Sequence, residues 1–316
     1  MFKQITIIGF GLIGSSIARA ARKNGLAHRI ICADQSREVC ETVKDLGLAD
    51  EVFTDLARSV RGSDLVILCV PVGAMQAVGT KIAPALEPDT VVTDVGSVKT
   101  SVMRTLQPLL SAKVHLVGGH PIAGTENSGP ESGFAELFIN RWCILTPLRH
   151  TELRAVEKLT AFWEGCGSNI EIMDPEHHDL VLGITSHLPH LIAYTIVGTA
   201  TDLEEDLKGE VIKYSASGFR DFTRIAASDP VMWRDVFLNN KDAVLEILQR
   251  FTEDLTAMQK AIRKADGEYL YQRFKETRDI RRAIIDAGQA AYVYPTQSEE
   301  AQAPAAAPPS KSGSSR

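Results

Sequence analysis

Cysteine is scarce in this sequence, and the few present do not form a metal-binding pattern. The 316 residues include five cysteines, an odd number without metal-ligand spacing: Cys32, Cys40, Cys69, Cys143 and Cys166. Cys32 and Cys69 fall inside apolar runs that predict buried strands, where a reduced thiol behaves as a small apolar side chain. This pattern favours a reducing, cytoplasmic location.

An excess of positive charge is also absent. Lysine and arginine number 34 against 40 aspartates and glutamates, which gives a net charge of −6 and a pI near 5.8. Nucleic-acid-binding domains carry clustered positive charge, so we expect no nucleic-acid partner and expect backbone amides to hold any phosphate-bearing ligand. We find neither a basic-then-apolar leader nor an apolar run of membrane-spanning length, and we therefore expect no membrane partner.

The first half of the chain alternates short apolar runs with helical patterns. The runs that predict strands are 5–8, 29–33, 65–70, 90–93, 114–117, 142–145 and 169–173. Helical periodicity lies between them over 12–24, 37–46, 72–83, 99–110 and 151–164. Such alternation is typical of an α/β fold with a mostly parallel, doubly wound sheet of the Rossmann type.

The pattern changes near residue 174, after which no convincing strand is found. Helices are predicted over 175–199, 203–215, 231–265 and 268–287. We therefore predict a nucleotide-binding domain over 1–173, an all-α domain over 174–295, and a tail over 296–316. The tail is rich in alanine, proline and serine and is expected to be disordered.

A glycine motif follows the first predicted strand and opens the first predicted helix. It reads Gly9-Phe10-Gly11-Leu12-Ile13-Gly14. Three glycines alone are a weak signal, but Asp34 ends the next strand 20 residues after Gly14, and this context matches a dinucleotide-binding fingerprint. Gly9 would make the tight turn, Gly11 would admit the pyrophosphate, and Gly14 would pack the helix on the sheet. The alternative is a glycine-rich turn with a capping acid.

Asp34 also bears on the choice of cofactor. A carboxylate there accepts hydrogen bonds from a ribose 2′-hydroxyl and repels a 2′-phosphate, which favours NAD over NADP. Arg37 could partly accommodate that phosphate, although we prefer to interpret it as a solvated first-turn residue. Val70-Pro71 and the Gly96-Ser97 turn are expected to line the nicotinamide half of the crevice.

A candidate catalytic base lies in the segment 118–126. This segment reads Gly118-Gly119-His120-Pro121-Ile122-Ala123-Gly124-Thr125-Glu126. Its glycines and proline predict that it is neither helix nor regular strand, so His120 is expected just beyond the strand 114–117, where α/β sheets bind ligands. The ordinary pKa of histidine suits a base that accepts the proton released with a hydride. The alternative is a structural histidine satisfied by a carbonyl group.

Two polar clusters interrupt the helical half. The first, Ser186-His187-Leu188-Pro189-His190, has two histidines but no acid or cysteine at ligand spacing, so we reject a metal site. The second runs from Gly218 to Trp233 and places arginines beside aromatic residues, a pattern that can bind carboxylates. An ion-pair network with Asp221 or Asp229 is the alternative.

Taken together, these motifs resemble one enzyme family. Five strings occur in this order: GFGLIGSS, DVGSVKT, GGHPIAGTENSG, SHLPH and GFRDFTRIAASDPVMWRD. Over roughly residues 4–290 the chain is similar to the prephenate/arogenate dehydrogenases of tyrosine biosynthesis. The resemblance implies an NAD(P)-binding Rossmann-type domain and a helical domain that forms a homodimer. It also implies oxidative decarboxylation of prephenate to 4-hydroxyphenylpyruvate, or of arogenate to tyrosine.

The resemblance also assigns roles to individual residues. It makes His120 the base that takes the proton from the ring 4-hydroxyl group, and Ser97 a hydrogen-bonding neighbour of that hydroxyl and of His120. Substrate-binding roles fall on Ser186 and His190, on Arg224 with its ion-pair partners Asp221 and Glu126, and on Trp233.

The same candidate site residues bear on the choice of substrate and on two alternative functions. Donor or neutral groups at the side-chain end favour prephenate over arogenate, although Glu126 or Asp221 facing the ligand would reverse this, and dual specificity is common in the family. A β-hydroxyacid dehydrogenase would need a lysine motif in the helical domain, which is not found. A non-enzymatic NAD-sensing module would not explain the convergence of these residues on one site.

We expect neither a chorismate mutase domain before Ile5 nor a regulatory domain after Ala291, so any feedback by tyrosine is expected to act near the active site.

Overall fold

The computed structural model describes residues 1–125, 127–202 and 217–286. The chain divides into two compact units, 1–250 and 251–316, and each is described by itself. The predicted helix over 203–215 and the predicted tail over 296–316 lie outside the described residues.

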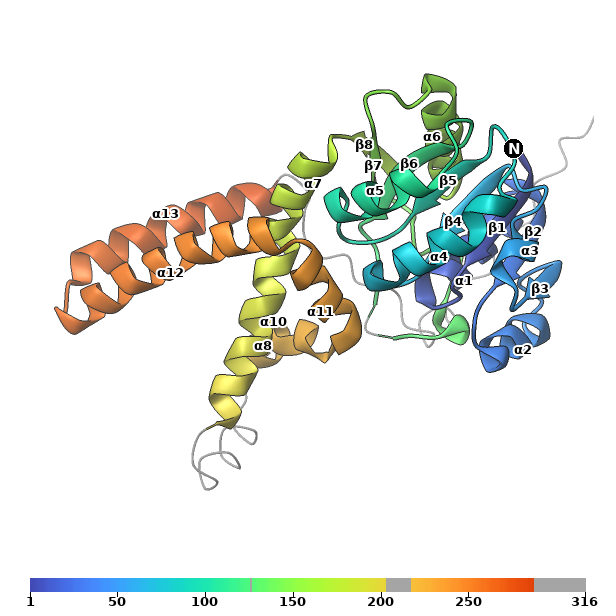
Figure 1. The fold of residues 1–316 in the computed structure, drawn as a ribbon. Helices are drawn as coiled ribbons and strands as arrows, with labels where there is room; N and C mark the ends of the chain where they lie inside the picture. Colours follow the sequence, from blue (N-terminus) through green and yellow to red (C-terminus); the bar gives the residue numbers. More distant parts are fainter. Residues whose placement is uncertain (126, 203–216, 287–316) are drawn as a thin grey trace, which may run out of the picture. The chain divides into compact units, whose positions relative to one another are not determined.

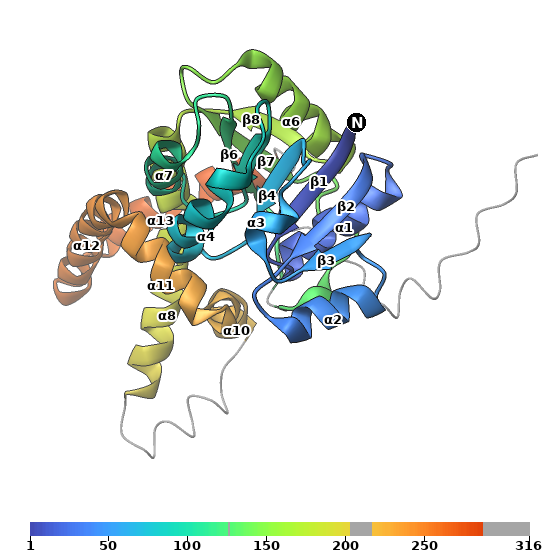
Figure 2. The same ribbon diagram turned by 45° about the vertical axis from the view of Figure 1, so that its right-hand side comes forward.

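An eight-stranded sheet forms the centre of the first unit, in the order β3-β2-β1-β4-β5-β6-β7-β8 (Figure 1). Figure 2 shows the part of the sheet from β4 through β1 and β2 to β3. The strands are β1 (Phe2–Ile8), β2 (Ala27–Ala33), β3 (Glu51–Phe53), β4 (Leu65–Leu68), β5 (Val91–Asp94), β6 (His115–Pro121), β7 (Trp142–Pro147) and β8 (Asn169–Ile172). Of the neighbouring pairs described, β6 and β7 are antiparallel and the others are parallel. The predicted mostly parallel, doubly wound sheet is confirmed.

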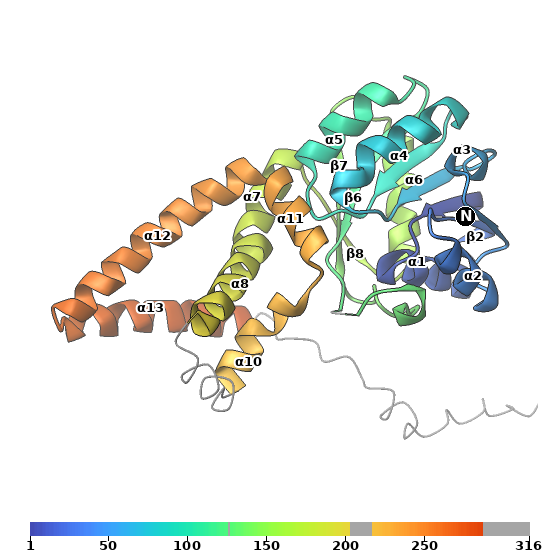
Figure 3. The same ribbon diagram turned by 60° about the horizontal axis from the view of Figure 1, so that its bottom comes forward.

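Helices cover both faces of this sheet (Figure 1). They are α1 (Leu12–Lys23), α2 (Arg37–Asp45), α3 (Leu56–Ser59), α4 (Met75–Ile82), α5 (Thr100–Leu106) and α6 (Leu153–Gly165). Helices α4 and α5 lie on the face opposite α1 (Figure 3). Under α4 and α5, side chains such as Val78, Ile82 and Leu106 form one buried cluster with Val66 and Leu116 of the strands. Burial of this apolar surface is the main force that holds the layers together.

Strand β3 was not predicted. Only three residues long, Glu51–Phe53 is half-buried or exposed and pairs with β2 at the edge of the sheet. An edge strand this short has no period that distinguishes it from a loop.

The first unit continues into helices after β8. They are α7 (Pro175–Leu182), the π-helical turn η5 (Gly183–His187), α8 (Leu188–Thr201), α10 (Ser217–Thr223), the 3-10 turn η6 (Arg224–Ala227) and α11 (Pro230–Asn239). Helix α7 begins as the sequence suggests, since Asp174 accepts a hydrogen bond of 2.8 Å from the backbone N–H of His177 and Pro175 takes the first helical position.

The predicted helix over 231–265 is two helices in the structure. Helix α11 ends before Asn240, and α12 (Lys241–Arg263) begins after it. The second unit contains the end of α12 and helix α13 (Gly267–Asp286). Within it, Arg273 lies 3.9 Å from Asp254.

The expectation that no apolar run reaches membrane-spanning length was wrong for one helix. Residues Pro175–Thr201 form 27 helical residues with a mean hydropathy of 1.5 over the most apolar window. Length and composition alone place this helix in that class, and 22% of that window is buried inside the structure. Buried polar side chains on it are hydrogen-bonded within the chain, as described below.

The glycine motif makes a testable contrast between two of its members. A Cβ atom on Gly14 would lie 2.1 Å from the backbone oxygen of Gly9, whereas a Cβ atom on Gly11 would meet no described atom within 4 Å. We predict that Gly14→Ala lowers the free energy of unfolding by about 1–3 kcal/mol, as overpacking against rigid backbone does. Gly11→Ala, the matched control, should change it by less than about 0.5 kcal/mol. Urea unfolding measures both, and equal effects would contradict this packing.

Candidate active site

The carboxyl end of β1 forms a tight loop into α1. Gly9 has a φ of 93°, and a Cβ atom there would lie 2.4 Å from the backbone oxygen of Cys69. Helix α1 begins after Gly11 with no side-chain cap and no acid in its first turn, within the described part of the chain. Its amino-terminal N–H groups and the open space at Gly11 therefore fit an anionic group such as a diphosphate.

Asp34 lies directly after β2 and spans this loop. Its Oδ2 accepts a hydrogen bond of 3.0 Å from the Phe10 N–H, and its Oδ1 accepts one of 2.9 Å from the Ser36 N–H. The carboxylate is thus fixed beside the glycine loop and remains half-buried. Arg37 begins α2, and its side chain is exposed.

His120 lies in a strand, which corrects the sequence prediction. Strand β6 runs through Gly118 and Gly119 to Pro121, and His120 pairs with Ile144 of β7. The prediction that 118–121 is neither helix nor regular strand was wrong because glycine marks close packing as well as turns. Only the residues after Pro121 leave the strand.

The close packing has a specific cause beneath these two glycines. A Cβ atom on Gly119 would lie 2.7 Å from the backbone oxygen of Asp94, and one on Gly118 would lie 2.3 Å from Thr146 Oγ1. Asp94 ends β5, and its carboxylate forms a fully buried ion pair with Lys99. Lys99 Nζ also donates to the backbone oxygen of Gly119 at 2.7 Å. The strand therefore lies directly on a buried charge pair, which its own backbone helps to satisfy.

A second histidine contacts His120. Nδ1 of His120 lies 2.8 Å from Nε2 of His178, and Nδ1 of His178 lies 2.9 Å from Oδ1 of Asp179. His178 is fully buried, and His120 and Asp179 are 8% and 4% exposed. Strand β6 and helix α7, which are far apart in the sequence, are thus joined through a chain of three polar side chains.

Asp179 ties this chain to the loop after β5. Its Oδ1 also accepts from the backbone N–H of Lys99 at 2.7 Å, and its Oδ2 accepts from that of Thr100 at 2.9 Å. These N–H groups begin α5, so a carboxylate from α7 caps a helix of the nucleotide-binding half. Asn240 completes the cluster, since its Nδ2 donates to the backbone oxygen of Asp179 at 2.8 Å.

Burial and hydrogen bonding set the protonation of these groups. Burial, followed by the charges of His178 and Lys99, places the pKa of His120 well below its ordinary value. Burial lowers the pKa of His178 as well, although the bond to Asp179 partly opposes this. For Asp179 burial raises the pKa, but hydrogen bonds from His178, Lys99 and Thr100 outweigh it, and the net pKa is lowered. At neutral pH both histidines are neutral and Asp179 is ionised.

A second polar cluster lies on α8 and α11. The rings of His190 and Trp233 are stacked with centroids 3.6 Å apart, and His190 Nδ1 lies 2.8 Å from the backbone oxygen of Ser186. His187 Nδ1 lies 3.0 Å from Nδ2 of Asn240. Trp233 Nε1 is buried without a hydrogen-bond partner among the described residues, whereas His187 interacts with the backbone of Ser97. A buried donor such as Trp233 Nε1 can serve an oxygen atom of a ligand.

The loop that carries Ser97 meets this cluster. Val98 packs against Trp233 and Val236, and Ser97 is half-buried. The segment after β4 that includes Val70 and Pro71 is also tied to α11, where Asp235 Oδ2 accepts from the Gly73 N–H at 3.2 Å.

The predicted arginine segment lies on α10 and η6. Arg224 begins η6 with an exposed side chain, and its charge contributes, after burial, to the lowered pKa of His190, so the two are neighbours. Asp221 is exposed on α10. Glu126, the other predicted partner of Arg224, lies outside the described residues.

The described residues contain no group of three metal-binding side chains. His187 contacts Asn240 and His190 stacks on Trp233, so the two histidines of the 186–190 segment serve different contacts.

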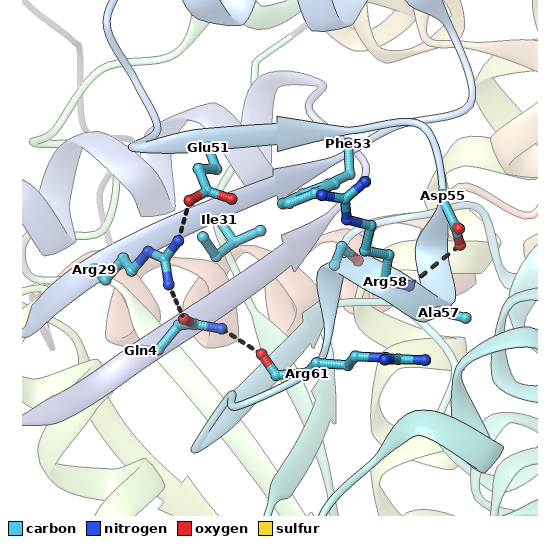
Figure 4. Close-up of a pocket in the computed structure, with 10 residues that line it drawn as sticks. Gln4, Arg29, Ile31, Glu51, Phe53, Asp55, Ala57, Arg58 and Arg61 are labelled. Carbon is cyan, nitrogen blue, oxygen red and sulfur yellow. Dashed lines mark hydrogen bonds and ion pairs between the residues drawn. The ribbon is translucent and has the colours of Figure 1, made fainter.

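A surface cavity of about 410 Å³ lies beside α3 (Figure 4). Two of its arginines have partners: Arg29 donates to Gln4 and pairs with Glu51, and Arg58 lies 5.3 Å from the centroid of the Phe53 ring. None of the predicted site residues lines it. We therefore assign the candidate site to the strand ends that carry Gly9, Ser97 and His120.

Sequence reasoning missed four of the residues described above: Asp94, Lys99, His178 and Asp179. Asp94 and Lys99 belong to the string DVGSVKT, yet nothing in it indicates that its lysine is buried. His178 and Asp179 follow the exposed residues Glu176 and His177 in one polar run at the start of α7. Nothing in this run distinguishes its two buried members from its two exposed ones.

Comparisons with known proteins bear on the family of the chain. Residues 17–172 match the family model "Prephenate dehydrogenase, nucleotide-binding domain", and residues 174–276 match "Prephenate dehydrogenase, dimerization domain". The chain belongs to the prephenate dehydrogenase family. Members of this family are oxidoreductases of aromatic amino acid biosynthesis, and so is this enzyme.

Three relatives illustrate the match. A cyclohexadienyl dehydrogenase of Zymomonas mobilis is 46% identical over 284 residues, which cover 90% of this chain and 97% of the relative. The crystal structure of prephenate dehydrogenase from A. aeolicus in complex with hydroxyphenyl propionate and NAD+ has a TM-score of 0.84 and 36% identity, covering 90% of this chain and 99% of that one. The arogenate dehydrogenase of Synechocystis has a TM-score of 0.75 and 28% identity, with coverages of 89% and 99%.

The buried histidines predict acid lability. Burial lowers the pKa of His187 from 6.5 to about 4. Between these pH values the unfolded chain binds more protons than the folded one, so stability is lost as the pH falls, by up to about 1.4 kcal/mol per pH unit for this residue. We predict that His187→Gln flattens the pH dependence of the free energy of unfolding in this range. The exposed His177 provides the control, since His177→Gln should keep the wild-type slope. An unchanged slope in His187→Gln would contradict the prediction.

Proposed function

We propose that this enzyme catalyses the NAD-dependent oxidative decarboxylation of prephenate to 4-hydroxyphenylpyruvate in tyrosine biosynthesis. The observation that carries the proposal is a buried, neutral histidine, His120, held through Nδ1 near the end of β6. A relative crystallised with hydroxyphenyl propionate and NAD+ supports a phenolic ligand and this cofactor.

The glycine loop is proposed to hold the dinucleotide. The N–H groups at the start of α1 would bind the diphosphate, and Asp34 would accept hydrogen bonds from the adenosine ribose. The proposed contacts come from Gly9, Phe10, Gly11, Leu12, Ile13, Gly14 and Asp34, with Val70, Pro71 and Ser97 at the nicotinamide half. Bound NAD supplies the chemistry that this chain lacks, acceptance of the hydride from the ring carbon that bears the hydroxyl group.

His120 is proposed as the general base. Its Nε2 would take the proton of the ring 4-hydroxyl group as the C–H bond at that carbon breaks. A low pKa keeps the ring neutral and ready for this transfer at neutral pH. Ser97 would hydrogen-bond to the same hydroxyl and hold it in line. Loss of CO₂ then makes the ring aromatic, which renders the step effectively irreversible.

The carboxylate end of the substrate is proposed to meet cationic and neutral donors. Arg224 would bind a carboxylate, with Asp221 and Glu126 as its ion-pair partners at the mouth of the site. Ser186, His190 and Trp233 would contact the side chain. His190 and Trp233 are stacked, which fixes the two rings relative to each other. Arg224, Ser186, His190 and Trp233 offer no carboxylate to the amino group that distinguishes arogenate. The keto acid prephenate is therefore preferred over the amino acid arogenate.

Arogenate is the second candidate substrate. An arogenate dehydrogenase and a cyclohexadienyl dehydrogenase are both similar to this chain. Dual specificity would follow if the side-chain end of the site tolerates both a keto and an amino group.

A homodimer in the cytoplasm is also proposed. The match to a dimerization domain supports self-association, and exposed apolar side chains on α11, including Val231 and Leu238, offer surface for it. All five cysteines are free thiols, as expected for a reducing compartment.

Steady-state kinetics with NAD and each of the two substrates test the proposed reaction. We expect the wild-type enzyme to turn over prephenate with a higher kcat/KM than arogenate. His120→Asn should lower kcat by about 10²- to 10⁴-fold because it removes the base, while the Kd for NAD stays unchanged. The same substitution at an exposed site, His150→Asn, is the control and should be silent.

Three results would count against parts of this proposal. No turnover of either substrate would reject the function. A near wild-type kcat for His120→Asn would remove His120 from the mechanism. A kcat/KM for arogenate well above that for prephenate would overturn the substrate preference.

Cofactor preference depends on Asp34. We predict that the wild-type enzyme uses NAD better than NADP, and that Asp34→Ser narrows the ratio of kcat/KM values by about tenfold or more. The change removes charged hydrogen bonds to the ribose and repulsion of the 2′-phosphate. Arg37→Ser should leave the ratio nearly unchanged. Equal or better use of NADP by the wild type would mean that Arg37 dominates.

A further inference from the structure

The contact between His120 and His178 has only one direction that fits its neighbours. Asp179 is ionised and therefore only accepts hydrogen bonds. Since Nδ1 of His178 lies 2.9 Å from Asp179 Oδ1, that nitrogen must carry the proton. A neutral imidazole has one N–H, so Nε2 of His178 is left as an acceptor.

The protonation of His178 in turn fixes that of His120. Nδ1 of His120 lies 2.8 Å from the accepting Nε2 of His178 and must therefore be the protonated nitrogen. Nε2 of a neutral His120 then has a free lone pair. Without this chain both tautomers of His120 would be populated, and one of them would present an N–H where a base is required.

We infer that His178 and Asp179 are positioning residues for catalysis, which hold His120 in the tautomer whose Nε2 accepts the substrate proton. The inference rests on the proposed role of His120 as the base. His178 touches no reacting atom in this scheme, and its action is through the hydrogen bond to Nδ1.

The hydrogen bonds from His120 to His178 and from His178 to Asp179 also act after the proton has been transferred. His120 then carries a positive charge close to the buried Lys99, whose charge disfavours it. The N–H at Nδ1 of the imidazolium still donates to His178, which in turn is anchored on the negative Asp179. An aspartate–histidine pair thus stabilises the cation in the way that an acid stabilises the histidine of a catalytic triad.

A role of His178 in packing alone and a role in holding the tautomer of His120 predict different effects of substitution. If His178 only fills space, replacements of similar size should be equivalent whatever their polarity. If it accepts the proton at Nδ1 of His120, a side chain with a carbonyl oxygen should retain more activity than an apolar one. His178→Gln and His178→Leu separate these cases.

The test is steady-state kinetics with NAD and the better of the two substrates, together with the Kd for NAD and thermal unfolding. We expect His178→Leu to lower kcat on the order of 10²-fold or more, as loss of the correct tautomer does in triad enzymes, with KM and the Kd for NAD little changed. His178→Gln should recover at least tenfold of that loss. His177→Gln, on the exposed neighbour in the same helix, is the matched control and should match the wild type.

The outcomes are distinguishable from failure of the proposed function. If the wild type has no activity, the reaction is wrong. If the wild type is active and His120→Asn is not, but His178→Leu keeps near wild-type kcat or equals His178→Gln, this inference alone is overturned. Should His178→Leu fail to fold, His178→Asn replaces it, because its shorter side chain cannot bring its carbonyl group to Nδ1 of His120. Equal kcat values for the Asn and Gln variants would then overturn the inference.

Discussion

The buried carboxylate of Asp179 is the constraint on which the rest of the site depends. It accepts hydrogen bonds from His178 and from the backbone N–H groups of Lys99 and Thr100 at the start of α5, at 2.7–2.9 Å. A charge removed from water to this extent is tolerated only when its oxygens are satisfied. Helix α7, the loop after β5 and strand β6 must therefore keep one mutual arrangement, which is the arrangement that places the proposed base.

A second buried charge fixes the strand from below. The ion pair between Asp94 and Lys99 is completed by the carbonyl group of Gly119, which accepts from Lys99 Nζ. Side chains at positions 118 and 119 are excluded by Thr146 Oγ1 and by the backbone oxygen of Asp94. The segments DVGSVKT and GGHPIAG therefore pack directly against each other in the folded protein. The glycines let the strand pass over the lysine, and the lysine holds the strand that carries His120.

Much of the fold could be predicted from the sequence because its signals are local. The apolar runs at 5–8 and 65–70 alternate with helical patterns, which is typical of a parallel sheet, and Asp34 follows the glycine motif at the spacing of a dinucleotide-binding fingerprint. Glycine was ambiguous at 118–119, where it indicates a close approach and not a turn. Strand β3 was too short to have a pattern. His120 was found because its neighbours in the sequence are unusual.

The supporting residues could not be found in the same way. His178, Asp179 and Lys99 act through contacts between segments about 20 to 80 residues apart. Such contacts leave no period along the chain, and a polar residue on an apolar helix has many explanations. Asn240 looked like one position within a continuous helix over 231–265, yet it ends α11 and binds the backbone of Asp179. Their roles follow from tertiary structure alone.

The tautomer of His120 in the unmodified enzyme tests the central claim most directly. Nitrogen-15 NMR of histidine-labelled protein distinguishes a protonated from an unprotonated ring nitrogen, and His120→Asn assigns the signals. At neutral pH the account predicts that His120 is neutral with its proton on Nδ1, and that this proton couples to Nε2 of His178. A His120 ring protonated on Nε2, or on both nitrogens, would contradict it.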